Sequence, residues 1–304
     1  MNCSPCRFFE VAEGVFLRYG VWPVAETRAR GRVILLQGRG EFLEKYDQTI
    51  QKLNQRGFDV FSFDWRGQGL STRMLPNRLK GHIETFDSYT QDVSRFIRDV
   101  AAGTSYNGPL IMLAHSMGGH IGVRFIHDHP GEIAGAVMVS PMIDILTHPF
   151  PRALAVGLAR IGVKIGFKRR YVIGSGGNKP AHARFEGNRL TADPVHFRQE
   201  KEMISENPKL AVYGVTYGWL DAAFRSIDLI RKNGYAQTIR TPILVVGAGS
   251  DRIVSVEAQK TLCAGAESMT FMSIPGARHE ILRETDSVQK IFWNAFDDFT
   301  GAVT

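Results

Sequence analysis

The feature that most constrains the fold is an apolar run, Leu110 to Ala114, followed at once by the residues His-Ser-Met-Gly-Gly at 115–119. The run has the length and apolar character of a strand buried on both faces. The small residues after it permit a very tight turn into a helix, and a serine at such a corner has its hydroxyl held out of the sheet. Ala114 stands where the usual Gly-x-Ser-x-Gly pattern has glycine, a mild departure because the position needs a small side chain. Ser116 is therefore either an exposed nucleophile or only the cap of the helix.

Further apolar segments with the length of buried strands occur on both sides of this turn. They lie at 32–37, 58–64, 134–140, 242–247 and 269–274. An opening strand is predicted over Phe8 to Tyr19, hairpinned with the segment around Val21 and Trp22. Helical patterns stand between and after the strands, at 44–56, 86–101 and 287–299. This alternation predicts an α/β protein with a mostly parallel sheet that is covered by helices on both faces.

The interval from Asp144 to Asn233 breaks the rhythm of strands. Roughly 90 residues without a core strand exceed an ordinary connection. The interval has helix-like stretches at 196–206 and 215–231, a glycine-rich stretch at 173–177 and a basic stretch at 164–170. A second independent domain is one interpretation. Because the sheet resumes at Pro242, we favour a helical cap at 144–235, inserted between two parts of one core, 1–143 and 236–304.

Two further candidates for catalysis follow later strands. A serine hydroxyl becomes a good nucleophile only beside a base, which a third group must orient. Asp251 follows the strand at 242–247, and His279 follows the strand at 269–274. The carboxyl ends of parallel strands meet at one edge of the sheet, where sites form. The order Ser116, Asp251, His279 is that of α/β-hydrolases. Alternatively, Asp251 and His279 are ordinary loop residues, and Asp144 is a rival acid.

The negatively charged oxygen of a tetrahedral intermediate needs backbone N–H donors. The amide of Met117, just after the serine, is one candidate donor, and the amide of Arg39 in the glycine-containing loop 38–40 is the second. An ordinary glycine-rich turn is the alternative for that loop. Four further histidines near the serine in sequence are interpreted as structural. They are His115, His120, His127 and His129.

Composition limits the class of protein. The chain has 304 residues, 44% of them hydrophobic and 22% charged, with a net charge of +7. The positive charge suits an anionic lipid surface, whereas no nucleic-acid recognition module is present. No apolar run reaches the length that spans a bilayer, and residues 1–7 lack the pattern of a secretory signal, so we expect a cytoplasmic protein. The three cysteines, Cys3, Cys6 and Cys263, argue against a disulfide framework, and we interpret the Cys3–Cys6 pair as part of a terminal tail.

With these motifs in place, the chain resembles the serine α/β-hydrolases of the lysophospholipase and monoacylglycerol lipase group. The resemblance covers most of the chain. It is carried by QGRGEFLEKY at 37–46, DWRGQGLS at 64–71, AHSMGG at 114–119, NRLTAD at 188–193, YGW at 217–219, and the strand-end residues at 251–252 and 278–280. It implies the α/β-hydrolase fold, with an eight-stranded, mostly parallel sheet, helices on both faces and a helical cap after the sixth strand.

The resemblance also implies roles for single residues. Ser116 would be the nucleophile, Asp251 the acid and His279 the base, with Arg39 and Met117 as oxyanion donors. The group usually has His-Gly where this chain has Gln37-Gly38. Because the donors are amides, loss of that imidazole need not abolish catalysis, but the geometry of the loop is left open. Asp64 belongs to a structural turn at a strand end in the group.

The implied substrates are esters with one long acyl chain, either lysophospholipids or monoacylglycerols. The basic cap favours a lysophospholipid and contact with an anionic membrane. Apolar cap residues either line an acyl tunnel, dock onto an interface or form the cap's own small core. They are Phe150, Leu154, Val156, Leu158, Ile161 and Phe167. Likewise, Lys168, Arg169 and Arg170 meet phosphate or only solvent.

Other functions remain on the same chain. A short-chain esterase or peptidase would use the same three residues, and a non-catalytic binding module would normally have lost one of them. Dehalogenases and epoxide hydrolases need an aspartate where Ser116 stands. No metal or organic cofactor is implied, and no oligomeric state is predicted.

Overall fold

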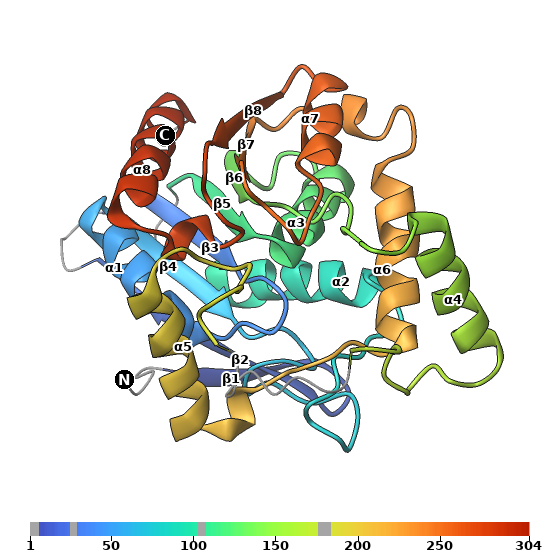
Figure 1. Cartoon of the computed structure of the whole chain (residues 1–304). Helices are drawn as coiled ribbons and strands as arrows, with labels where there is room; N and C mark the ends of the chain where they lie inside the picture. Colours follow the sequence, from blue (N-terminus) through green and yellow to red (C-terminus); the bar gives the residue numbers. More distant parts are fainter. Residues whose placement is uncertain (1–5, 25–28, 103–107, 176–183, 304) are drawn as a thin grey trace.

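A computed structural model of the chain describes residues 6–24, 29–102, 108–175 and 184–303. One sheet of eight strands runs through it in the order β1-β2-β4-β3-β5-β6-β7-β8 (Figure 1). The strands are β1 (Arg7–Ala12), β2 (Val15–Trp22), β3 (Gly31–Leu36), β4 (Phe58–Phe63), β5 (Leu110–His115), β6 (Gly135–Val139), β7 (Ile243–Ala248) and β8 (Met269–Ile274). β2 pairs antiparallel with both β1 and β4, and the other neighbours pair parallel. The predicted mostly parallel sheet is confirmed.

The opening hairpin differs from the prediction. Its turn lies at Glu13 and Gly14, so the segment expected as one strand is divided between β1 and β2. Val21 and Trp22 continue β2 and pair with β4. Gly14 has a φ of 67°, a conformation that glycine adopts without steric cost, so this glycine was the missed signal for the turn.

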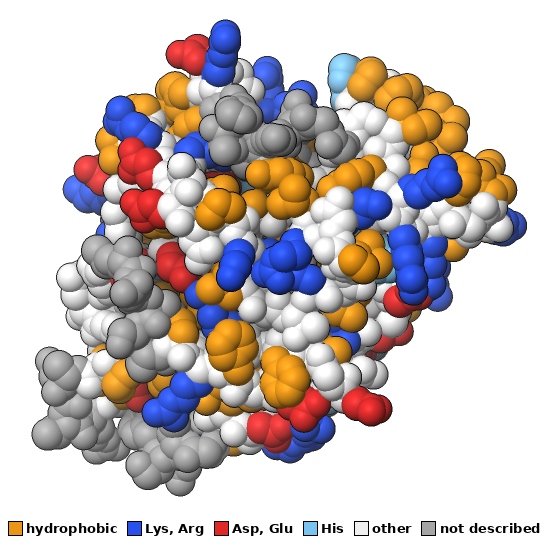
Figure 2. Space-filling view, turned by 90° about the horizontal axis from the view of Figure 1, so that it is seen from below, with side chains coloured by type: hydrophobic (Ala, Val, Ile, Leu, Met, Phe, Trp, Pro, Cys, Tyr) orange, Lys and Arg blue, Asp and Glu red, His pale blue; other side chains and the backbone are white. Residues whose placement is uncertain are grey.

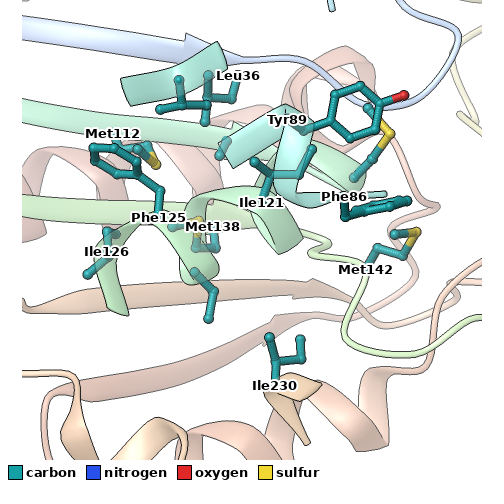
Figure 3. Packing of buried hydrophobic residues seen from close by; sticks show 14 of the residues in the cluster. Leu36, Phe86, Tyr89, Met112, Ile121, Phe125, Ile126, Met138, Met142 and Ile230 are labelled. Atoms are coloured by element: carbon teal, nitrogen blue, oxygen red, sulfur yellow. The ribbon is translucent and has the colours of Figure 1, made fainter. Parts of the chain in front are cut away.

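Helices cover both faces of the sheet because alternate strand residues point to opposite sides. Val33 and Leu35 pack with α1 (Asp47–Gln55) and α8 (Asp286–Val303) on one face. Ile34 and Leu36 point to the other face, which is covered by α2 (Asp87–Phe96), α3 (Met117–Asp128) and α7 (Val256–Ala264). Figure 3 shows this second layer, where Ile121 of α3 lies among the side chains of strands and neighbouring helices. The helix expected at 86–101 is α2 followed by a π-helical turn, Ile97–Ala101.

In the described residues, three α-helices lie in the insertion between β6 and β7, which confirms the predicted position of the cap. They are α4 (Arg152–Lys164), α5 (Pro194–Glu206) and α6 (Tyr217–Ile230). The inner side of α6 belongs to the same hydrophobic cluster as the sheet, and α4 packs on α6. α5 lies on the opposite side of the molecule, close to α1 (Figure 1). The helices α4 and α6 therefore share a hydrophobic core with the sheet. Limits at residues 144 and 235 stay a prediction.

Two observations bear on expectations from composition. Within the described residues, none of the helices is both long and apolar enough to cross a membrane. Cys3 lies outside the described residues, Cys6 is disulfide-bonded and Cys263 is a buried free thiol. The odd cysteine count did not predict the disulfide.

Candidate active site

Ser116 occupies the corner between β5 and α3. Its backbone has φ 52° and ψ −112°, a conformation that costs a non-glycine residue about 1–3 kcal/mol. Hydrogen bonds hold the corner in place. The Ser116 amide donates to the carbonyl of Val139 at 2.9 Å. The Ser116 carbonyl accepts from the amides of His120 at 3.1 Å and Met142 at 2.9 Å. The strand β6 and the loop after it therefore fix the serine from one side.

The two glycines after the serine are required by close packing. A Cβ atom on Gly118 would lie 2.6 Å from the carbonyl oxygens of Leu36 and Gln37 at the end of β3. A Cβ atom on Gly119 would lie 2.8 Å from the ring of Pro141. Side chains at these positions would push α3 away from the sheet. The sequence Gly118-Gly119 thus lets the helix begin directly beneath the serine.

The structure brings the three predicted side chains together at the carboxyl edge of the sheet. The Oγ atom of Ser116 lies 2.9 Å from Nε2 of His279, and Nδ1 of His279 lies 2.7 Å from Oδ2 of Asp251. All three side chains are almost completely shielded from solvent. The arrangement permits a proton to pass from the hydroxyl to the imidazole while the carboxylate orients the ring.

The surroundings of Asp251 favour its charged form. Burial alone would raise the pKa of Asp251, but the hydrogen bond and charge of His279, with the amides of Ile253 and Val254, hold this pKa below its usual value. The two amides donate to Oδ1 at 2.8 and 3.1 Å. The rival acid Asp144 is engaged elsewhere, in ion pairs with Arg152 and Arg231.

Two backbone amides close to the serine are left available. The Gly38 amide donates to Glu41, and the Gly40 amide donates to Oε1 of Gln68 at 2.5 Å. Between them, the Arg39 amide has no acceptor among the described residues. The backbone amide of Met117, the first residue of α3, has none there either. Both are the amides that the sequence singled out as candidates for an oxyanion hole. The backbone carbonyl of Gln37 accepts from the indole N–H of Trp65 at 2.8 Å, and the side-chain amide of Gln37 is buried without a partner among the described residues.

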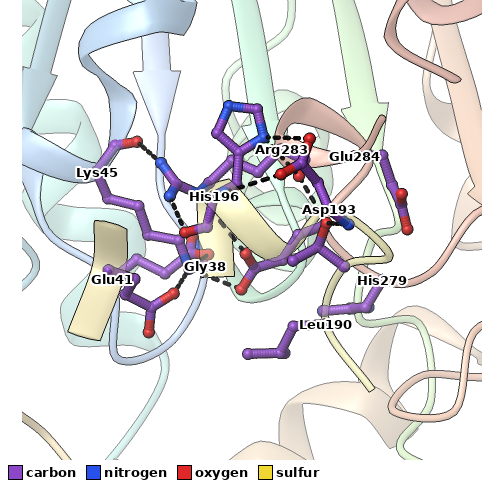
Figure 4. A network of polar contacts seen from close by, with 12 residues as sticks. Gly38, Glu41, Lys45, Leu190, Asp193, His196, His279, Arg283 and Glu284 are labelled. Atoms are coloured by element: carbon purple, nitrogen blue, oxygen red, sulfur yellow. Dashed lines mark hydrogen bonds and ion pairs between the residues drawn. The ribbon is translucent and has the colours of Figure 1, made fainter. Parts of the chain in front are cut away.

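A buried network of charged side chains lies behind His279, and sequence reasoning missed it (Figure 4). Lys45 makes ion pairs with Glu280 at 2.6 Å, Glu200 at 2.8 Å and Glu41 at 3.0 Å. Burial would lower the pKa of Lys45, but the three carboxylates raise it. These residues lie far apart in the sequence, so no local pattern marks their meeting. The network joins the loop after β3, the loop after β8 and the cap helix α5.

The histidines near the serine serve other contacts. His115 points into the network, with Nδ1 3.1 Å from Glu41. His120 lies between the Met142 carbonyl and the Ser226 hydroxyl. On the surface, His127 pairs with Asp128 and His129 with Glu132.

The contacts of the predicted substrate-binding residues in the cap are with residues other than Ser116, Asp251 and His279. Phe150 is exposed. Phe167 is half-buried, with the guanidinium of Arg170 4.2 Å from the centre of its ring. Arg169 is exposed, and its carbonyl accepts from Lys80. In the described parts of the chain, no group of three or more His, Cys, Asp or Glu side chains is placed to hold a metal ion.

The strand order and the placing of serine, acid and histidine after β5, β7 and β8 define an α/β-hydrolase with a cap between its sixth and seventh strands. The profile of the family described as serine aminopeptidase, S33, matches residues 27–286, which is most of the chain. The chain belongs to this α/β-hydrolase family.

Several proteins similar to this chain are named as lysophospholipases or as lipases. The chain is 31% identical over 287 residues to a probable lysophospholipase L2 of Haemophilus influenzae, covering 94% of this chain and 88% of the relative. It is 30% identical to lysophospholipase L2 of Escherichia coli K12, covering 91% and 84%. Among solved structures, monoglyceride lipase of Saccharomyces cerevisiae has a TM-score of 0.78 at 23% identity, covering 98% of this chain and 95% of that one. At this identity, the similarity to the yeast structure shows a shared fold and no more. The chain is a hydrolase of the lysophospholipase and monoglyceride lipase type.

Proposed function

We propose that the chain hydrolyses the long-chain acyl ester of a lysophospholipid through an acyl-enzyme on Ser116. His279 removes the hydroxyl proton as Ser116 attacks the ester carbonyl, and Asp251 orients the ring. The amides of Arg39 and Met117 stabilise the oxyanion. The alcohol leaves with the proton from His279. Water, deprotonated by the same ring, then releases the fatty acid and regenerates the serine.

The observation that carries this proposal is the hydrogen-bonded chain Ser116–His279–Asp251, with distances of 2.9 and 2.7 Å. Catalytic hydrogen bonds in this range need no rearrangement before proton transfer. The strained backbone of Ser116 adds support, because strain of this kind persists where the surrounding structure holds a reactive group in place.

A second observation favours a phosphate-bearing head group over glycerol alone. The side chain of Arg39, whose own amide is a candidate oxyanion donor, is partly buried, and burial lowers its pKa although the charge of Glu41 opposes this. Its guanidinium donates to the carbonyl of Tyr213 at 3.1 Å and lies over the ring of Trp219, 5.7 Å from the ring centre. By contrast, Arg18 is buried with two carboxylates, Glu44 and Asp64. A partly buried guanidinium that forms no ion pair with a carboxylate of the described residues suits an anionic ligand group.

The names of the relatives support the same substrate class, since two are lysophospholipases. A monoacylglycerol lipase is the second candidate, supported by the relative named monoglyceride lipase in Saccharomyces cerevisiae, 27% identical over 307 residues. A short-chain esterase or peptidase on the same triad is the third, in line with the description of the family as serine aminopeptidase. A non-catalytic binding module would leave the ordered triad without a use.

Kinetics on a matched panel test the proposal. Lysophosphatidylethanolamine, the monoacylglycerol with the same acyl chain and p-nitrophenyl butyrate would be compared by kcat/KM. We expect the lysophospholipid to be preferred, and Arg39→Met to reduce its kcat/KM by about 10-fold or more while sparing the monoacylglycerol. A preference for the uncharged lipid would overturn the head-group assignment. Ser116→Ala should lower turnover of all three by about 10⁶-fold and abolish labelling by a fluorophosphonate probe.

The cap supports a further proposal, contact with an anionic membrane surface. One stripe of α4, with spacing of three and four residues, is exposed, and Figure 2 shows hydrophobic and basic side chains together along that edge of the molecule. The stripe consists of Leu154, Leu158, Ile161 and Ile165. The opposite face, with Val156, Ala159 and Gly162, is buried on α6. An amphipathic helix with an exposed apolar stripe and basic neighbours such as Arg160 and Lys164 is typical of interfacial binding.

A further inference from the structure

The side chain of His115 faces only hydrogen-bond acceptors. Its Nδ1 atom lies 3.1 Å from Oε2 of Glu41, and its Nε2 atom lies 3.2 Å from the backbone carbonyl oxygen of His279. A carboxylate and a carbonyl both accept and neither donates. The hydroxyl of Tyr46, 3.4 Å from Nδ1, is directed to Oε2 of Glu41 at 2.5 Å, so its proton is engaged there. Both ring nitrogens must therefore carry protons to satisfy these contacts.

We propose that His115 is a buried imidazolium whose two N–H groups join Glu41 to the carbonyl of His279 and so position the candidate base against Ser116. His115 is a positioning residue and does not touch the reacting atoms. Its ring lies 4.9 Å, centre to centre, from the ring of His279.

The charges around the ring are consistent with this state. Three carboxylates, on Glu41, Glu200 and Glu280, surround Lys45 in the buried network. Lys45 alone does not balance them, and Arg283, 4.0 Å from Glu280, supplies a second cation. Lys201, 3.4 Å from Glu200, supplies a third, and an imidazolium at His115 adds a positive charge directly beside Glu41. Burial by itself would lower the pKa of His115, but the charge and hydrogen bond of Glu41, with the charge of Glu280, raise it above the usual value.

A second buried histidine shows the opposite pattern. His120 has Nδ1 3.0 Å from the carbonyl of Met142 and Nε2 2.6 Å from the hydroxyl of Ser226. The hydroxyl can donate, because Arg124 donates to the same oxygen at 3.1 Å and leaves the serine proton free for the ring. One ring proton is then enough. Burial, with the charge of Arg124, lowers the pKa of His120 to about 3. His120 is therefore the matched control for His115.

Glu41 connects the ring to the other half of the site. The same carboxylate oxygen accepts from the amide of Gly38, which precedes the candidate oxyanion donor Arg39. The groups that face His115 are Glu41, Lys45 and Tyr46 from the segment after β3 and His279 and Glu280 from the loop after β8. Through this one carboxylate, the loop of the oxyanion donor and the loop of the base are held to each other.

Nitrogen-15 NMR of the histidine rings in the full chain tests the protonation state directly. We expect both ring nitrogens of His115 to carry protons at pH 7, and His120 to be a neutral ring with one. The variant His115→Gln identifies its resonances, and backbone assignment of the wild-type chain serves if that variant does not fold. A single-proton ring at His115 at pH 7 overturns the proposal, whatever the substrate proves to be.

Kinetics test the positioning role, which rests on the proposed ester hydrolysis. His115→Gln should lower kcat for p-nitrophenyl butyrate by about 10–100-fold with KM nearly unchanged, since a small displacement of a catalytic group has that cost. His120→Gln should stay within about 3-fold of the wild type. Unchanged kcat in His115→Gln would refute the role, whereas absence of wild-type esterase activity would refute the proposed function and leave the NMR result standing.

The pH dependence of stability has opposite signs for the two rings. A raised folded-state pKa at His115 gives stability that is present below about pH 6.5 and is lost as the pH rises through the folded-state pKa. A lowered pKa at His120 removes stability as the pH falls below about 6.5. In urea unfolding, the stability lost in His115→Gln should shrink with rising pH, and that in His120→Gln should shrink with falling pH. The same sign for both variants would contradict the assignment.

Discussion

Helices α4 and α5 belong to the same insertion, yet they meet the core in opposite ways. α5 is tied to the catalytic edge by polar contacts. Glu200 pairs with Lys45, the carbonyl of His196 accepts from Arg283 at 2.6 Å, and the carbonyl of Leu190, just before the helix, accepts from the amide of Glu280 at 2.8 Å. α4 packs small residues on α6 and leaves its apolar stripe in solvent.

This difference is what the proposed membrane contact requires, because that proposal gives the two arms of the insertion separate tasks. The arm at α5 contacts the residues next to His279, so a rigid α5 stabilises the geometry of the base loop. The arm at α4 has few polar anchors, chiefly Arg152 with Asp144 and Asp228, and it carries the exposed apolar surface. Chemistry needs a fixed arrangement, whereas binding of aggregated lipid needs an accessible apolar face.

The largest expected effect comes from breaking the α5 side. Lys45→Met leaves three buried carboxylates without their shared cation and should destabilise the folded chain by about 3–5 kcal/mol. Urea unfolding at pH 8 measures this loss. Lys52→Met, which removes a hydrogen bond to Gln289, is the control and should cost less than about 1 kcal/mol.

The double variant Lys45→Met with Glu200→Gln should recover part of that stability, because one unpaired charge is removed. Equal losses for Lys45→Met and Lys52→Met would show that the network does not anchor α5.

Removing the apolar stripe of α4 should act on membrane binding alone. Combined Leu158→Ser, Ile161→Ser and Ile165→Ser should weaken partitioning onto anionic vesicles by about 100-fold, at about 1 kcal/mol per side chain. The urea midpoint and p-nitrophenyl butyrate turnover should stay unchanged, because Ile161 and Ile165 are 55% and 58% exposed. Ile291→Ser on α8, 46% exposed, is the matched control. An equal loss of vesicle binding in that control would remove the special role of α4.

Two glycines of α4 test how the helix is held on α6. A Cβ atom on Gly162 would lie 2.4 Å from the ring of Tyr217, whereas nothing lies within 4 Å of one on Gly157. Gly162→Ala should therefore destabilise by about 1–3 kcal/mol, with faster hydrogen exchange in α4. Gly157→Ala should stabilise by about 0.5–1 kcal/mol. Identical signs would mean that the α4–α6 contact differs from the close packing described.

The smallest expected effect concerns the start of α5. The side chain of Asp193 accepts from the amides of Val195 at 2.7 Å and His196 at 3.0 Å, while Pro151, the residue before α4, provides no side-chain cap. Asp193→Ala should lower the free energy of unfolding in urea by about 1 kcal/mol. Asp193→Ser should keep most of the wild-type stability, because serine also caps helices. If Asp193→Ala leaves the stability unchanged, α5 is anchored by its contacts with Lys45 and Arg283 and not by its cap.

Much of the fold was predictable because its signals are local. The apolar runs that became β3, β5, β6 and β7 are buried on both faces, so their composition identifies them without knowledge of their neighbours. The opening hairpin was misplaced because the signal of Gly14 for a turn was missed, whereas the pairing of Val21 and Trp22 with β4 depends on residues far away in the sequence.

The sequence by itself determined the strand rhythm, the place of the insertion and the order of Ser116, Asp251 and His279, since each depends on residues adjacent to one another in the chain. The tertiary structure decided that these three side chains meet, that Lys45 lies among carboxylates from three segments, and that His115 faces two acceptors. Such contacts join residues up to 235 positions apart, as Lys45 and Glu280 are. Their geometry depends on how the sheet and helices pack, and no local pattern of residues encodes it.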